Sequence, residues 1–145
     1  MKTVEIYIET SIKGPGVKDG RYAAALVFAK PGGECVVRTL TGEESESTYN
    51  RCTLLAVIRA LRRMNQKCHV IIYTDNAYVK GMTEQENPEK WRRAEWKRAA
   101  GGEVHNRELW ELFLEEKEKQ EIEFRFCKYS IYSDSLQAAM KGEEI

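Results

Sequence analysis

The feature that most constrains this chain is an apolar run that ends on an acidic residue. Residues 70–79, VIIYTDNAYV, are rich in strand-forming residues up to Thr74 and continue with Asp75 and Asn76. A carboxylate at the end of a buried strand is costly unless another group pairs with it. Two interpretations are open at this point: Asp75 caps the helix that follows, or it belongs to a functional site.

The segments around this run predict alternating strands and helices. Apolar residues alternate in the strands and recur at helical spacing in the helices, and Gly and Pro mark the turns between them. The polar stretch TGEESEST is predicted to be a connector, and Ser47 or Thr48 to cap the helix after it. The predicted elements are strands over 2–8, 22–29 and 34–40, a helix over 49 to about 64, a strand over 70–74, a short helix from Asn76, a helix capped by Asn106 and running to about Gln120, a strand over 122–126 and a helix from about Ser133.

The first three predicted strands form an antiparallel meander, and a helix then leads into the strand over 70–74. This order favours a parallel pairing of strand 70–74 with the first strand. Glu9 and Asp75 would then end neighbouring strands at one edge of the sheet, where α/β folds place their sites.

Length and composition predict one globular domain spanning residues 1–145. The chain is 42% hydrophobic and 32% charged, which is unlike a disordered chain. Its formal net charge is zero, so a nucleic-acid partner would have to meet a local basic patch.

The sequence also indicates a cytoplasmic location. No apolar run approaches the roughly 20 residues that cross a bilayer, and the N-terminus MKTVEIYIET does not resemble a signal peptide. The four cysteines are widely spaced, which predicts free thiols and argues against a zinc site.

Residues 90–107 interleave basic and aromatic side chains. Trp91 and Trp96 have two interpretations, packing between short helices or contact with nucleic acid. The basic residues would hold phosphates without reading the base sequence. The candidate nucleic-acid contacts of this segment are Trp91, Arg92, Arg93, Trp96, Lys97 and Arg98.

Four motifs, in this order and spacing, resemble ribonuclease H of the bacterial type 1 family over nearly the whole chain. YIETS places Glu9 where the family's first strand ends on an aspartate. YNRCTLLA places Thr53 where the family's first helix carries a glutamate. YTDN matches the motif that ends the family's fourth strand and contains Asp75, and YSDSLQAA aligns Asp134 with the fourth acid. The basic segment 90–107 resembles the family's handle.

The resemblance implies a five-stranded mixed sheet flanked by helices, with strands 1–3 antiparallel and strands 4 and 5 parallel to strand 1. It also implies binding of RNA/DNA hybrid or a related duplex, with Asn50 at a position that contacts the minor groove. Two-metal hydrolysis of a phosphodiester uses converging carboxylates to hold Mg²⁺ or Mn²⁺. The resemblance assigns the catalytic and metal-binding roles to Glu9, Asp75 and Asp134.

The chain departs from the family pattern at three places. Thr53 supplies a neutral hydroxyl where the family has a carboxylate, and Glu9 is one methylene longer than the family's aspartate. Ser130 stands where the family has a histidine, in a loop that is shorter by about six residues. These departures predict a degenerate two-metal site that binds metal weakly and leave open whether the protein is an enzyme. The alternative is a non-catalytic module that docks protein or nucleic acid.

Overall fold

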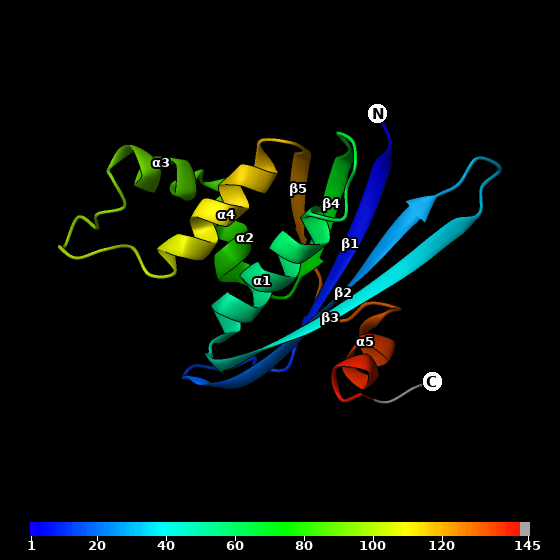
Figure 1. Cartoon of the computed structure of the whole chain (residues 1–145), viewed down its shortest axis with the longest axis horizontal. Helices are drawn as coiled ribbons and strands as arrows, with labels where there is room; N and C mark the ends of the chain where they lie inside the picture. The colour runs from blue at the N-terminus through cyan, green and yellow to red at the C-terminus, as the bar shows by residue number, and fades with distance from the viewer. Residues whose placement is uncertain (143–145) are drawn as a thin grey trace.

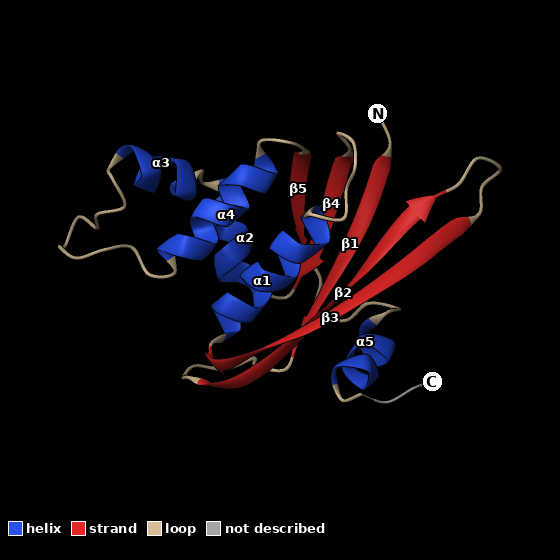
Figure 2. Cartoon of the chain, viewed as in Figure 1, coloured by secondary structure: helices blue, strands red, loops and turns tan. Residues whose placement is uncertain are grey.

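The computed structural model of this chain describes residues 1–142 and folds them into one five-stranded sheet with helices on both faces (Figures 1 and 2). The predicted single domain over 1–145 stays a prediction, and positions 143–145 lie outside the described part. The strands are β1 (Thr3–Thr10), β2 (Lys18–Ala29), β3 (Cys35–Ser47), β4 (His69–Thr74) and β5 (Glu121–Phe126). The helices are α1 (Tyr49–Leu61), α2 (Ala77–Glu84), α3 (Asn87–Arg93), α4 (Arg107–Lys117) and α5 (Ser133–Met140).

The sheet has the strand order β3-β2-β1-β4-β5, with β1 in the centre. Strands β1, β2 and β3 pair antiparallel, whereas β4 pairs parallel with both β1 and β5. The predicted fold class is confirmed. The parallel pairing aligns Tyr7 with Tyr73, so the residues that follow each strand lie at the same edge of the sheet.

The hairpin of β2 and β3 is longer than predicted. The stretch TGEESEST was expected to be a connector, but all of it up to Ser47 belongs to β3. Its backbone pairs with the start of β2, and the register shifts between Lys18 and Gly20. A Cβ atom at Gly20 would lie 2.6 Å from the sulfur of Cys52. The polar residues of this stretch are in a strand because their backbone groups pair with β2.

Most of the core lies between the sheet and α1. Val4, Ile6 and Ile8 point to that face from alternate positions of β1, and all three are buried. Helix α1 begins as predicted, because the Thr48 side chain accepts a hydrogen bond from the Arg51 amide, but it ends at Leu61 instead of near residue 64. Burying each large aliphatic side chain contributes roughly 1.5–3 kcal/mol.

The other face of the sheet is covered by α5. Small side chains there, Ala23 and Ala25, allow Leu136 and Met140 of α5 to approach the sheet closely. Figure 1 shows α5 on the side of the sheet opposite α1. Helix α5 therefore begins beside the strand end that carries Glu9.

Helices α2, α3 and α4 continue the α1 layer (Figure 1). Trp110 of α4 is buried, and its ring meets Trp91 edge-on with centroids 5.4 Å apart. Asn106 precedes α4 as predicted, but its side chain does not cap the helix. Its backbone is left-handed, with φ of 62°, and its side-chain oxygen instead accepts a hydrogen bond from Arg51.

None of the helices in residues 1–142 is long and apolar enough to cross a bilayer.

Candidate active site

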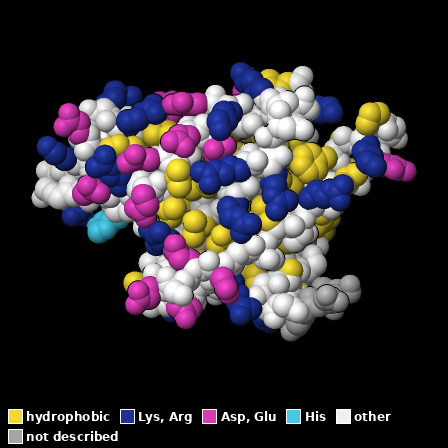
Figure 3. Space-filling view, viewed as in Figure 1, with side chains coloured by type: hydrophobic (Ala, Val, Ile, Leu, Met, Phe, Trp, Pro, Cys, Tyr) yellow, Lys and Arg dark blue, Asp and Glu magenta, His cyan; other side chains and the backbone are white. Residues whose placement is uncertain are grey.

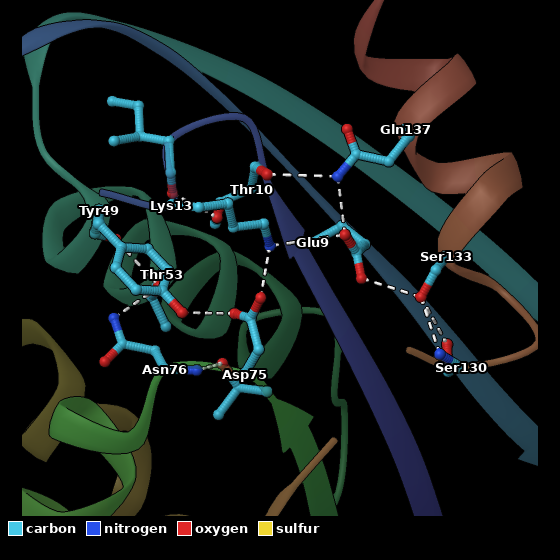
Figure 4. Close-up of polar contacts among 12 residues, drawn as sticks. Glu9, Thr10, Lys13, Tyr49, Thr53, Asp75, Asn76, Ser130, Ser133 and Gln137 are labelled. Atoms are coloured by element: carbon cyan, nitrogen blue, oxygen red, sulfur yellow. Dashed lines mark hydrogen bonds and ion pairs between the residues drawn. The ribbon is translucent and has the colours of Figure 1, made fainter. Parts of the chain in front are cut away.

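Two carboxylates meet at the edge of the sheet where β1 and β4 end. Glu9 is the penultimate residue of β1 and is 8% exposed, and Asp75 directly follows β4. The ammonium of Lys13 lies 2.7 Å from Oδ2 of Asp75 and 3.6 Å from Oε1 of Glu9 (Figure 4). The structure therefore brings these two predicted residues together, with a lysine between them.

The second oxygen of Asp75 is also engaged. The Tyr49 hydroxyl donates a 2.6 Å hydrogen bond to Oδ1, and burial together with this carboxylate raises the pKa of Tyr49. Asp75 does not cap α2, because that role belongs to Asn76, whose side-chain oxygen accepts from the Val79 amide. The capping interpretation of Asp75 is wrong.

Glu9 is held by two residues of α5. Gln137 Nε2 donates to Oε1 across 2.7 Å, and Ser133 Oγ donates to Oε2 across 3.0 Å. The Ser130 amide in turn donates to Ser133 Oγ. Each of the four oxygens of Glu9 and Asp75 thus has a partner supplied by the chain itself (Figure 4).

Thr53 lies inside the protein beside these groups and is 0% exposed. Its hydroxyl donates to the carbonyl of Tyr49 at 3.0 Å and accepts from Asn76 Nδ2 at 3.1 Å. The same Asn76 amide donates to Oδ1 of Asn50 at 2.9 Å. A neutral network therefore fills the place where the resemblance implies a third carboxylate.

Asp134 lies in the first turn of α5 and is exposed. Asp134 is the largest cause that raises the pKa of the Tyr129 hydroxyl. The α5 residues that contact Glu9 are its neighbours Ser133 and Gln137. Within residues 1–142, Asp134 makes no hydrogen bond to Glu9 or Asp75, and its role as a site residue stays a prediction.

The donor set does not fit a pair of divalent ions. Within residues 1–142, no group of three or more His, Cys, Asp or Glu side chains is placed to hold a metal. The two carboxylates that converge, Glu9 and Asp75, already share a positively charged partner, the Lys13 ammonium. Magnesium demands several oxygen ligands in near-octahedral geometry, and Thr53 offers a hydroxyl that is already bonded on both sides.

A groove leads from this edge toward the basic segment. It has a volume of about 530 Å³, and Lys13 and Tyr49 line it beside the loop over 14–16. Asn50 lines the same groove, as does His105 of the segment 90–107. The groove therefore extends from Lys13, which contacts both carboxylates, to the C-terminal end of the basic segment.

The aromatic residues of the basic segment are packed. Trp96 is 5% exposed and has the guanidinium of Arg107 5.9 Å from its ring centroid, and Trp91 is half-buried against Trp110. This geometry favours the packing interpretation of both tryptophans. Their contact with nucleic acid stays a prediction.

The basic side chains of this segment are exposed, as nucleic-acid contacts require. Arg92 pairs with Glu118 at 3.0 Å, and Arg98 lies 3.3 Å from a ring nitrogen of His105. Figure 3 shows Lys and Arg interspersed with acidic side chains over the end of the molecule that carries α3. The side chains of the candidate phosphate contacts are all exposed: Arg92, Arg93, Lys97 and Arg98.

Sequence reasoning missed the residues that complete the site. Lys13, Tyr49 and Gln137 were not candidates, although each contacts Glu9 or Asp75. Lys13 stands four residues after Glu9, in a Gly-Pro turn with no periodic pattern. For Gln137 the sequence offers one signal. It lies four residues after Ser133 on the same predicted helix, so the two side chains are expected on one face of that helix.

Comparisons with known proteins place these features among ribonucleases H. The family model described as RNase H matches residues 1–129, a stretch that ends before Asp134. A ribonuclease H of Hahella chejuensis is 38% identical over 130 residues, which cover 88% of this chain and 82% of that protein. A ribonuclease H of Xanthomonas oryzae pv. oryzae is also 38% identical over 130 residues and is covered to 81%.

Solved structures show the same fold. LC9-RNase H1, described as a type 1 RNase H with the type 2 active-site motif, superposes with a TM-score of 0.78 at 25% identity. The alignment covers 99% of this chain and 74% of that one. A foamy viral protease-reverse transcriptase in complex with RNA/DNA hybrid matches 97% of this chain and 19% of its own, with a TM-score of 0.71 and 14% identity.

Proposed function

This chain belongs to the ribonuclease H family, and from that premise we propose that it binds RNA/DNA hybrid through the groove and the basic segment. The observation that carries the proposal is the convergence of Glu9 and Asp75 on Lys13, which lines a groove that extends to His105 near the end of the basic segment. A duplex lying in that groove would present its backbone both to the carboxylate edge and to the exposed basic side chains.

The residues assigned to the nucleic acid are Asn50 in the groove and the exposed cations of the basic segment. Asn50 shares its side-chain oxygen with Asn76, which leaves its side-chain amide as a donor for a base edge or a sugar hydroxyl. The 2′-hydroxyl distinguishes an RNA strand from DNA at such a contact. Arg92, Arg93 and Lys97 would supply contacts to phosphates that weaken with salt.

The site is proposed to be degenerate as a nuclease. Glu9 and Asp75 are already paired within the chain, and Thr53 brings no charge. Mg²⁺ or Mn²⁺ is expected to bind weakly, and cleavage of the RNA strand is expected to be slow or absent. Asp134 stays a prediction as a further ligand.

The alternative is a non-catalytic docking module in which the fold alone is used. The complete pairing of the carboxylate oxygens favours this alternative, because partners within the chain stabilise the two acids without a metal ion. A cytoplasmic location suits both functions, and the four cysteines are free thiols.

Hybrid binding and cleavage separate these functions. Fluorescence anisotropy with a labelled RNA/DNA hybrid and a matched DNA duplex in EDTA measures binding, and a denaturing gel in Mg²⁺ or Mn²⁺ measures cleavage. We expect the parent to prefer the hybrid and to cleave it slowly or not at all, with Asp75→Asn as the inactive control. Rapid cleavage by the parent that Asp75→Asn abolishes would contradict the degenerate site. Absence of hybrid binding would leave the docking module.

A further inference from the structure

The carboxylate pair of Glu9 and Asp75 has a cation built into it. Lys13 Nζ is 2.7 Å from Asp75 Oδ2 and 3.6 Å from Glu9 Oε1, so one ammonium contacts both acids. Two carboxylates close enough to contact the same ammonium repel each other unless a positive charge lies between them. In Figure 4 the lysine reaches this position from the loop that follows β1.

We propose that Lys13 is the resident cation of this site, taking the place of a divalent ion between Glu9 and Asp75, and that such an ion enters only by displacing it. The remaining oxygens are occupied by donors from separate elements, Tyr49 of α1 and Ser133 and Gln137 of α5. The chain thereby satisfies every oxygen of the pair without a metal.

The surroundings of Lys13 allow its ammonium to move away from the two carboxylates. Its side chain is 42% exposed and lies near the Tyr49 ring, 5.9 Å from the centroid. The loop beyond it contains Gly14 and Gly16, and a Cβ at either would meet nothing within 4 Å. The groove of about 530 Å³ that Lys13 lines gives the displaced side chain room.

An internal cation has a different effect from a bound ion. Its effective concentration is fixed by the loop, so the charge balance of the site does not vary with the metal in solution. A divalent ion has to overcome this contact before it gains its own ligands, which lowers its apparent affinity. Removing the lysine would leave two unbalanced carboxylates that attract a divalent cation more strongly.

The test is a Mn²⁺ titration that needs no nucleic acid, so its outcome is independent of the proposed hybrid binding. Calorimetry gives the Mn²⁺ affinity of the parent, Lys13→Met and Lys13→Arg, and thermal unfolding is followed in EDTA and in Mn²⁺. Lys30→Met is the matched control, because it removes one positive charge at the β2–β3 turn, far from the site. Lys13→Met/Asp75→Asn tests whether any new binding uses the pair.

We expect Lys13→Met to bind Mn²⁺ at least tenfold more tightly than the parent, to unfold at a lower temperature in EDTA and to regain stability with Mn²⁺. Lys13→Arg and Lys30→Met should behave like the parent, and adding Asp75→Asn to Lys13→Met should abolish the gain. Equal Mn²⁺ affinity of the parent and Lys13→Met would overturn the proposal. An equal gain in Lys30→Met would also overturn it, because net charge alone would then explain the effect.

Discussion

The side-chain amide of Asn76 donates a 3.1 Å hydrogen bond to the hydroxyl of Thr53. This contact joins the start of α2 to the α1 position where the ribonuclease H pattern carries a glutamate. Asn76 also caps α2 through the Val79 amide and donates to Asn50. The side chain of Asn76 thus connects the end of β4 and the start of α2 to Asn50 and Thr53 of α1.

The first prediction concerns Thr53→Glu, alone and with Glu9→Asp. A carboxylate at this fully buried position beside Glu9 and Asp75 should reduce the free energy of unfolding in EDTA by about 3 kcal/mol or more, because the charge is buried without a partner. Mn²⁺ should restore part of that stability, and the double variant should show more hybrid cleavage than the parent. Urea unfolding with and without Mn²⁺ and a cleavage gel measure the two effects.

Thr53→Gln is the matched control, with nearly the same length and no charge. It should lose stability without any recovery in Mn²⁺. If both variants respond equally to Mn²⁺, the added carboxylate does not complete a metal site.

The second prediction concerns the basic segment. Replacing Arg92, Arg93, Lys97 and Arg98 with Ala should weaken hybrid binding severalfold at low salt and flatten the dependence of affinity on salt concentration. Anisotropy titrations over a range of KCl concentrations measure both changes. A variant with Lys2, Lys30, Arg38 and Arg63 replaced removes four charges from a different groove and should keep the parent's salt slope. Equal losses in the two variants would show that the segment has no special role.

The third prediction separates Asp134 from the residues that hold Glu9. In the Thr53→Glu background, Asp134→Asn should lower Mn²⁺ affinity less than Asp75→Asn, because Asp134 is exposed whereas Asp75 meets Glu9 at Lys13. Gln137→Ala should change the Mn²⁺ affinity as well, because it removes the hydrogen-bond donor that Oε1 of Glu9 has besides Lys13. Calorimetric titration compares the three. An equal loss with Asp134→Asn and Asp75→Asn would establish Asp134 as a ligand.

The fourth prediction concerns the pH dependence of stability around Arg51. Hydrogen bonds from Arg51 lower the pKa of Glu44 and of Glu108. Carboxyls whose pKa is lower in the folded state stabilise the protein above their unfolded pKa of 4.5, and this contribution is lost as the pH falls through the folded pKa. The stability difference between the parent and Arg51→Met should therefore be largest near neutral pH and shrink below the unfolded pKa.

Urea unfolding across that pH range measures this difference. Removing Arg51 should cost about 1–3 kcal/mol near neutral pH, because the half-buried Glu44 loses its partner. Arg38→Met, which removes an exposed cation from β3, is the control and should show no such pH dependence. A difference that does not change with pH would mean that Arg51 stabilises by packing alone.

Much of the fold follows from local patterns in the sequence. The alternation Val4, Ile6, Ile8 sets one face of β1, and the helical spacing of Leu54, Val57 and Leu61 sets the buried face of α1. The pattern does not show how far a polar strand continues. Residues 41–44 and Ser47 pair with β2 across a shift in register, because β2 offers backbone partners there that the polar composition does not reveal.

The sequence by itself determined that Glu9 and Asp75 meet. Each acid ends a buried strand, and two parallel neighbouring strands must deliver their ends to one edge of the sheet. Only the tertiary structure decided what surrounds them. Lys13 arrives from a turn, and Gln137 from a helix that packs on the far face of the sheet. Local periodicity fixes which way a side chain points from its own element, whereas contacts between distant segments depend on how the loops close and how the helices dock.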